Sequence, residues 1–114
     1  MPMLNTRMLN RHTLSAGDTM ALSAALDVGD FTSLDVVITV DEAGAGDAPL
    51  LELQHAACNE DDGYLSCNPS QTVDLSVAGK TWIHLDQFTR FLRWSLSGAL
   101  ESSATVTIDV VARR

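Results

Sequence analysis

The sequence is poor in cysteine and has no long hydrophobic run. Cys58 and Cys67 are the only two cysteines in 114 residues, too few for the disulfide framework of a small secreted scaffold. In a reducing compartment we expect two free thiols rather than a bridge between them. No apolar run approaches the roughly 20 residues of a membrane-spanning helix, and residues 1–12 lack the apolar segment of a signal peptide. We therefore expect the protein in the cytoplasm or within a virion or phage-like particle assembled there.

Basic residues are also scarce. Seven Lys and Arg stand against 15 Asp and Glu, for a net charge of −8, and no Lys or Arg lies between His12 and Gly79. So acidic a chain repels nucleic acid and anionic membranes, so neither is an expected partner. The charge split has two interpretations. It is an ordinary solvated surface, or the basic ends meet the acidic middle of neighbouring copies, which would favour self-assembly.

A catalytic constellation is missing as well. The histidines are His12, His55 and His84, and none lies in a nucleophile or phosphate-loop motif. His55 and His84 fall in predicted strands, where a hydrogen-bonded structural role is the simpler interpretation. The sequence therefore predicts no enzyme, no catalytic residue and no cofactor.

Two metal sites can be drawn from the residues, and neither is favoured. Zinc would need His55, Cys58, Cys67 and His84, but only the first two have the close spacing of typical zinc ligands. The acidic run of residues 59–63, Asn59 to Gly63, offers oxygen ligands for calcium without EF-hand spacing, and a solvated turn explains it equally well.

Alternating apolar residues are what the chain does have. The stretch 80–98 contains both tryptophans, and within it Leu92, Trp94 and Leu96 alternate with polar residues, which is typical of a half-buried strand. Gly98 is predicted to end that strand in a turn. Residues 33–41 show the clearest alternation. The other predicted strands are 4–14, 19–28, 50–57, 71–78, 81–85 and 102–113. Exposed loops are predicted at 42–49 and 58–70.

The same alternation assigns side chains to the core. The predicted inward residues are Leu34, Val36, Ile38, Val40, Leu51, Leu53, His55, Val73, Leu75, Val77, Leu92, Trp94, Leu96, Val106, Ile108 and Val110. An Ala-rich helix competes for residues 20–26, because alanine favours helix.

Seven or eight short strands predict an all-β fold, an antiparallel two-sheet β-sandwich or jelly roll. An OB-type barrel has fewer strands and usually a basic face, so it is less favoured. We expect residues 1–14 to form an N-terminal arm or first strand, and residues 15–114 a single sandwich domain.

A resemblance adds a function class. The segments LLELQHA, QTVDLSVAGKTW, FLRWSLSG and TVTIDVVAR, with the Asp62-Gly63 step between the first two, form a recurring pattern. The pattern resembles small β-sandwich structural modules of tailed phages and phage-derived particles. The resemblance implies a non-enzymatic protein that decorates, cements or joins shell and tail subunits.

We therefore expect a structural protein that self-assembles or coats a larger particle. Its expected partners are other copies of itself, as a homo-oligomer, and a shell or tail protein. Outward-pointing apolar residues and the scattered bases are the candidate interface: Arg7, Arg11, Val37, Phe91, Arg93, Val111, Arg113 and Arg114. The alternative is a carbohydrate- or calcium-dependent binding module with Trp82 and Tyr64 exposed for stacking, while Trp94 belongs to the core.

Overall fold

The computed structural model describes residues 3–15, 25–67 and 72–114, except for the side chains of residues 48, 61 and 99. Within these ranges the chain forms nine strands and a short 3₁₀ turn at Asp61–Gly63. The strands are β1 (Met3–Leu14), β2 (Leu26–Asp27), β3 (Ser33–Glu42), β4 (Gly46–Ala56), β5 (Leu65–Ser66), β6 (Thr72–Asp74), β7 (Gly79–Leu85), β8 (Phe91–Leu100) and β9 (Ala104–Arg113).

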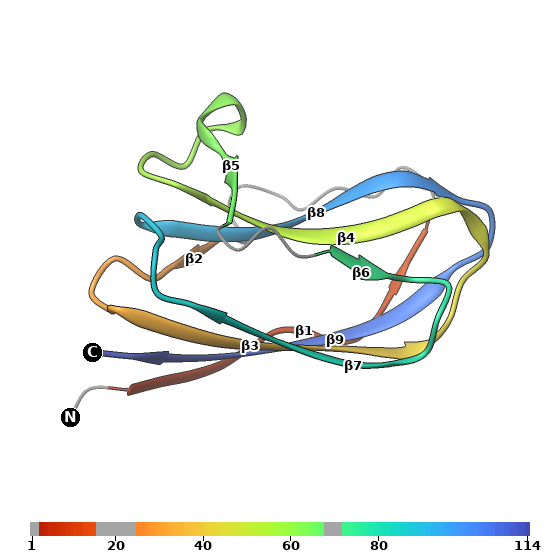
Figure 1. The fold of residues 1–114 in the computed structure, drawn as a ribbon, viewed down its shortest axis with the longest axis horizontal. Helices are drawn as coiled ribbons and strands as arrows, with labels where there is room; N and C mark the ends of the chain where they lie inside the picture. Colours follow the sequence, from red (N-terminus) through yellow and green to blue (C-terminus); the bar gives the residue numbers. More distant parts are fainter. Residues whose placement is uncertain (1–2, 16–24, 68–71) are drawn as a thin grey trace.

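The strands form two antiparallel sheets that lie face to face (Figure 1). One, the four-stranded sheet, has the order β1-β9-β3-β7. The other, the five-stranded sheet, has the order β2-β8-β4-β5, with β6 also paired to β4. The all-β, antiparallel sandwich is confirmed. The strand count differs from seven or eight because three of the nine strands are only two or three residues long.

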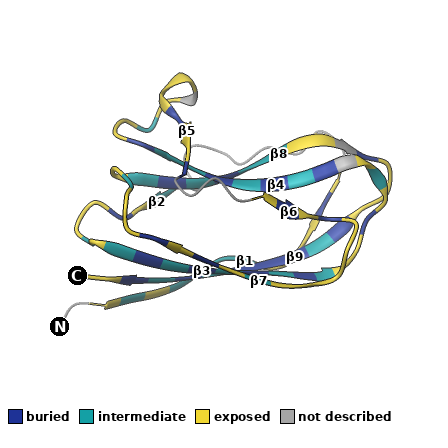
Figure 2. Ribbon diagram, viewed as in Figure 1, coloured by how far each residue is buried: buried dark blue, intermediate teal, exposed yellow. Residues whose placement is uncertain are grey.

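The core lies between the sheets and follows the predicted alternation. In β3, Leu34, Val36, Ile38 and Val40 are all buried, and Trp94 of β8 is buried in the same core cluster. Figure 2 shows buried stretches in both sheets. Each fully buried large apolar side chain contributes about 1.5–3 kcal/mol, so this layer dominates the stability of the fold. The remaining predicted core residues found buried are Leu51, Leu53, Val73, Leu75, Leu92, Val106, Ile108 and Val110, while His55 and Leu96 are half-buried.

The predicted loop at 42–49 is wrong. β4 already begins at Gly46, and Pro49 is buried. The backbone N–H of Gly44 donates to Leu75 O at 2.9 Å, and Leu75 N–H donates to Pro49 O at 2.9 Å. A Cβ at Gly44 would lie 2.6 Å from Ser102 O. The small residues are therefore there because backbones pack closely, and not because the segment is an exposed loop.

Two further predictions, the turn at Gly98 and the inward position of Val77, are corrected. Gly98 does not end its strand, because β8 continues to Leu100 and Gly98 takes φ 76° opposite a register shift in β4. Val77 is 62% exposed, not inward. Its strand ends at Asp74, whose carboxylate accepts hydrogen bonds from both the N–H and the hydroxyl of Ser76 and so forms a turn.

The strand predicted at 19–28 and the competing helix at 20–26 lie largely outside the described residues. In the part of this segment that is described, Leu26–Asp27 forms β2. No helix within the described ranges is long and apolar enough to cross a bilayer.

Candidate functional surface

The outer face of the four-stranded sheet is the candidate functional surface. Because alternate residues of its strands fill the core, the residues between them point away from it. Cross-strand pairing places Arg7, Asp109, Val37 and Trp82 in one row across all four strands. A second row contains Asn5, Val111, Asp35 and His84.

Most of the predicted interface residues are brought together here. Arg7, Arg11, Val37, Val111 and Arg113 all belong to the strands of this sheet, at positions between the core residues. Phe91 and Arg93 lie instead on β8 of the five-stranded sheet, and Arg114 follows β9 as an exposed terminal residue.

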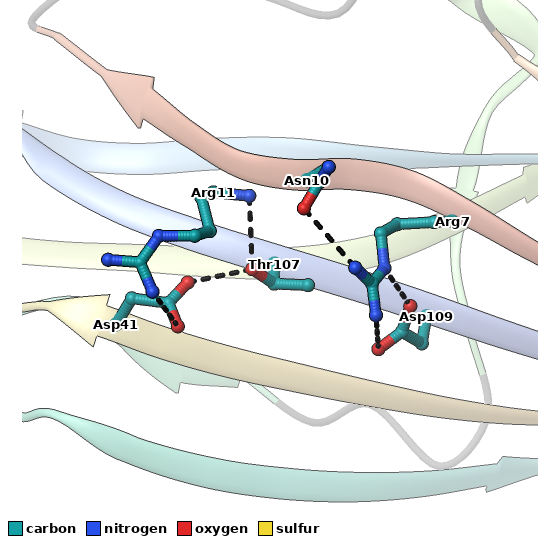
Figure 3. Close-up of polar contacts among 6 residues, drawn as sticks. All are labelled: Arg7, Asn10, Arg11, Asp41, Thr107 and Asp109. Carbon is teal, nitrogen blue, oxygen red and sulfur yellow. Dashed lines mark hydrogen bonds and ion pairs between the residues drawn. The ribbon is translucent and has the colours of Figure 1, made fainter.

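A polar hollow of about 260 Å³ lies across the four strands of this face. Its lining residues are Arg7, Asn10 and Arg11 of β1, Thr107 and Asp109 of β9, Thr39 and Asp41 of β3, and Lys80 of β7. Figure 3 shows its two groups of contacts. In the first, Arg7 Nε donates to Asp109 at 2.6 Å, and the same guanidinium reaches Asn10 at 3.2 Å. The hydrogen bond to Asp109 and the charge of its carboxylate raise the pKa of Arg7.

The second group ties three strands together. The backbone N–H of Arg11 donates to the Thr107 hydroxyl at 3.0 Å, and that hydroxyl donates to Asp41 at 2.7 Å (Figure 3). The Arg11 guanidinium lies 3.8 Å from the same carboxylate. Arg11 has φ 48°, a left-handed conformation unusual for a residue with a side chain. β1 therefore bends locally at a point held by β9 and β3.

Asp35 of β3 is the centre of the other half of the face. Its carboxylate accepts a hydrogen bond from Trp82 Nε1 at 2.9 Å, contacts His84 Nδ1 at 2.8 Å and binds the Arg113 guanidinium. The bond to His84 is the largest cause of a pKa lowered to about 2, and the Trp82 and Arg113 bonds add to it against the opposing effect of desolvation. Asp35 is thus a charged group that holds three side chains from two neighbouring strands.

Trp82 is the most exposed large hydrophobic residue of the described part of the chain, at 68%. Its exposure was expected only under the alternative of a carbohydrate-binding module, and the hydrogen bond that fixes its indole was not predicted. Asp35, Asp41, Asp109 and Thr107 were also missed as members of the site. The one signal for them in the sequence is that they alternate with apolar residues, which shows their side of the sheet but not their partners.

The separation of basic ends from an acidic middle is explained by ion pairs within one chain, whereas the assembly hypothesis expected such pairs between neighbouring copies. Arg11 pairs with Asp41, and Arg113 with Asp35, so the basic ends meet the acidic middle within one chain. β1 is a paired strand of the sheet rather than a free arm. These bases remain about half exposed or more, so they still form part of the accessible face.

Tyr64 is not available for stacking, which corrects the expectation of an exposed ring. It is 8% exposed, with the Arg93 guanidinium 3.9 Å from the ring centroid, and its hydroxyl donates to Asn59 Oδ1 at 2.6 Å. Arg93 also donates to Gln54 at 2.8 Å. The five-stranded sheet therefore uses Arg93 and Tyr64 to hold its own loop in place.

The metal hypotheses find no support in the geometry. Nowhere in residues 3–15, 25–67 and 72–114 do three His, Cys, Asp or Glu side chains come close enough together to hold an ion. Within the zinc set, the imidazole of His55 hydrogen-bonds Thr89 and that of His84 hydrogen-bonds Asp35. Cys58 and Cys67 do not pair with each other in the structure: Cys58 is exposed and Cys67 is buried. Burial, followed by the charge of Glu52, raises the pKa of Cys67 to about 12.

The comparisons with known proteins support the fold. No protein-family model matches the chain, and no curated protein matches it either. Among solved structures, the SPBc2 prophage-derived protein YomS superposes with a TM-score of 0.51 at 14% identity, over 97% of this chain and 96% of its own. The sandwich is shared with a prophage-derived protein. The K1 cleaved adhesin domain of Lys-gingipain from Porphyromonas gingivalis W83 also matches, with a TM-score of 0.40 at 13% identity, over 77% of this chain and 57% of that one. That second likeness is too partial to bear on this chain.

Proposed function

We propose that this protein is a non-enzymatic structural β-sandwich. It acts by binding other copies of itself, or by decorating or joining the parts of a larger phage-like particle, through the outer face of its four-stranded sheet. The observation that carries the proposal is Trp82, whose indole is exposed on this face yet held by Asp35. Exposing so large an apolar ring forgoes the stability that its burial would bring, and covering it by a partner recovers that stability.

The surroundings of Trp82 have the composition of a protein interface. Tryptophan and arginine are the residues enriched at binding hot spots, and Arg7 and Arg113 share the face with Trp82. Val37 and Val111 add half-buried apolar surface between them. Because the ion pairs with Asp109 and Asp35 already hold both arginines, little side-chain freedom is left to lose on binding.

The non-enzymatic part of the proposal has its own support. Asp35 has its carboxylate occupied by three donors and a pKa of about 2, so it stays ionised and is a poor general base near neutral pH. His84 contacts that same carboxylate through Nδ1. The contact between Asp35 and His84 thus helps to position Trp82, which is bound to the same carboxylate.

Sedimentation velocity over a wide concentration range, with electron microscopy of the concentrated protein, tests assembly directly. We expect a species larger than 12.3 kDa whose population increases with concentration, and at least a tenfold weaker association for Trp82→Ala. Val77→Ala is the matched control, because Val77 is also exposed but lies in the turn after β6. A wild-type chain that remains a monomer throughout, and that binds no co-expressed shell or tail protein, would refute the proposal.

A carbohydrate-binding module is the second candidate, because a fixed and exposed indole is also suited to stacking on a sugar ring. The burial of Tyr64 leaves Trp82 as the one residue of the predicted stacking pair that a sugar could reach. A glycan array probed with the wild-type chain and with Trp82→Ala separates the two functions. Binding to a glycan that the variant loses would favour the module.

A further inference from the structure

Among the strands that the structure describes, the two sheets have four edges, and three of these edges are poor templates for another strand. In the five-stranded sheet, the edge strands are the two-residue β2 on one side and the two-residue β5 and three-residue β6 on the other. In the four-stranded sheet, β1 is long but has register shifts between Arg7 and Leu9 and between Leu9 and His12. Short strands and bulges are the usual protection of edges against pairing with other chains.

β7 is the one of these four edges that is both long and free of register shifts. Its seven residues pair with β3 without a register shift, from Val40 opposite Gly79 to Leu34 opposite Leu85. It contains no proline, and among the described residues no strand pairs with its other side. Alternate N–H and C=O groups of β7 are therefore directed away from the sheet and available to an added strand.

The best-matched added strand is β7 of a second copy. Two β7 strands that pair antiparallel about a two-fold axis form a closed dimer, because the free β7 edge of each copy is then hydrogen-bonded to that of the other. Pairing of β7 with β1 of another copy would instead leave further edges free, and the shifts in β1 interrupt its register. In addition, β7 has no acidic residue, so two chains of net charge −8 can approach there with little local repulsion.

Trp82 is the central residue of β7. In the symmetric register it lies directly opposite Trp82 of the second copy, and Lys80 lies opposite the second copy's His84. Directly opposed side chains of antiparallel strands have Cβ atoms about 4.5–5.5 Å apart, and aromatic pairs are among the most favourable there. The exposed indoles would then cover each other on the outer face of one continuous eight-stranded sheet.

From this geometry we infer that the chain forms a two-fold dimer by antiparallel pairing of β7 with β7 of a second copy, centred on Trp82. The inference deepens the proposed function, on which it rests, by naming the edge and the partner. Since overall repulsion between two acidic chains is screened by salt, the dimer becomes tighter as ionic strength rises, whereas an interface of ion pairs would weaken.

Cysteine cross-linking tests the register without replacing Trp82 itself. In a Cys58→Ser background, two single variants, Lys80→Cys and His84→Cys, are oxidised separately and as a mixture; the remaining Cys67 is buried. We expect a disulfide-linked dimer from the mixture and almost none from either variant alone, because residue 80 of one copy lies opposite residue 84 of the other. A mixture of Asn5→Cys and His84→Cys is the control, since Asn5 lies on β1 at the far edge, and it should not cross-link.

The outcomes separate this inference from the proposed function. A cross-link in the first mixture alone, with Trp82→Ala at least tenfold weaker in dimerisation, supports β7 pairing. Assembly of the wild-type chain without that cross-link overturns the β7 dimer and leaves the proposed function standing. Cross-linking of residue 80 or 84 to a shell or tail protein in place of a second copy also overturns it. A chain that stays monomeric and binds no such protein overturns both.

Discussion

Replacing Asp35 by alanine tests how the outer face is held together. The carboxylate is 16% exposed and holds Trp82, His84 and Arg113. Hydrogen bonds to a charged group contribute about 1.5–3 kcal/mol each, but these three donors are about half exposed or more and regain water when released. Discounting for that exposure gives a loss of about 1–2 kcal/mol in the free energy of unfolding.

The pKa of Asp35 gives a second estimate of the same quantity. A fall from 3.8 to about 2 corresponds to roughly 2 kcal/mol before any discount for solvent screening. Because the folded-state pKa is depressed, this stability is fully present above the unfolded value near pH 4 and is lost as the pH falls through about 2. The difference between wild type and Asp35→Ala should therefore be constant above about pH 5 and shrink towards zero by about pH 2.

Urea unfolding followed by tryptophan fluorescence measures the difference at each pH. Asp109→Ala is a suitable control, because Asp109 is also paired with an arginine on the same face but is more exposed, at 39%. Its loss should be under 1 kcal/mol. A wild-type advantage over Asp35→Ala that is absent at neutral pH, or that does not change between about pH 5 and 2, would refute the assignment of Asp35 as the central acceptor.

Two other predictions concern the two cysteines and Thr107. Cys58, which is exposed, should react with iodoacetamide in the native protein at the rate of a free thiol, while Cys67, buried and with its pKa raised to about 12, should react only after denaturation. Equal native rates, measured by mass spectrometry, would contradict the burial of Cys67. Thr107→Val should lower the free energy of unfolding by about 1–2 kcal/mol, because it leaves the Arg11 N–H and the Asp41 carboxylate without their shared hydroxyl. Thr107→Ser keeps that hydroxyl and should be less destabilised than Thr107→Val. Equal destabilisation of the two variants would show that the hydroxyl does not stabilise the fold.

Alternation along single strands was enough to predict the fold class. Each of Leu34, Val36, Ile38 and Val40 is inward because neighbouring residues of one strand point to opposite faces, and this needs no knowledge of the partner strand. The prediction was wrong where long-range packing decides the outcome. Pro49 looks like part of a loop in the sequence, but it is buried because its carbonyl pairs with Leu75 across the sheet.

The candidate surface was predictable only in part, for a related reason. Polar or charged side chains between core residues indicated an outer face, but not that Asp35 would receive Trp82 and Arg113 from strands 47 and 78 residues away in sequence. Such contacts depend on strand order and register, which one sequence does not reveal. The prediction of an exposed Tyr64 ring was wrong for the same reason, since the ring is covered by Arg93 of β8.

The pairing of the first strand with the last has a consequence for how the chain is made. In the described part of the four-stranded sheet, β9 is the strand that pairs with β1, with Met3 opposite Arg113. On the ribosome, β1 emerges before the other described strands, and its partner does not exist until β9 has been made. Closing so distant a contact is slow, because the entropy of the intervening chain must be lost first. Until β9 has been synthesised, the four-stranded sheet cannot form completely. A nascent chain stalled before β9 would leave β3 and β7 exposed, and these strands could bind chaperones or aggregate with other nascent chains.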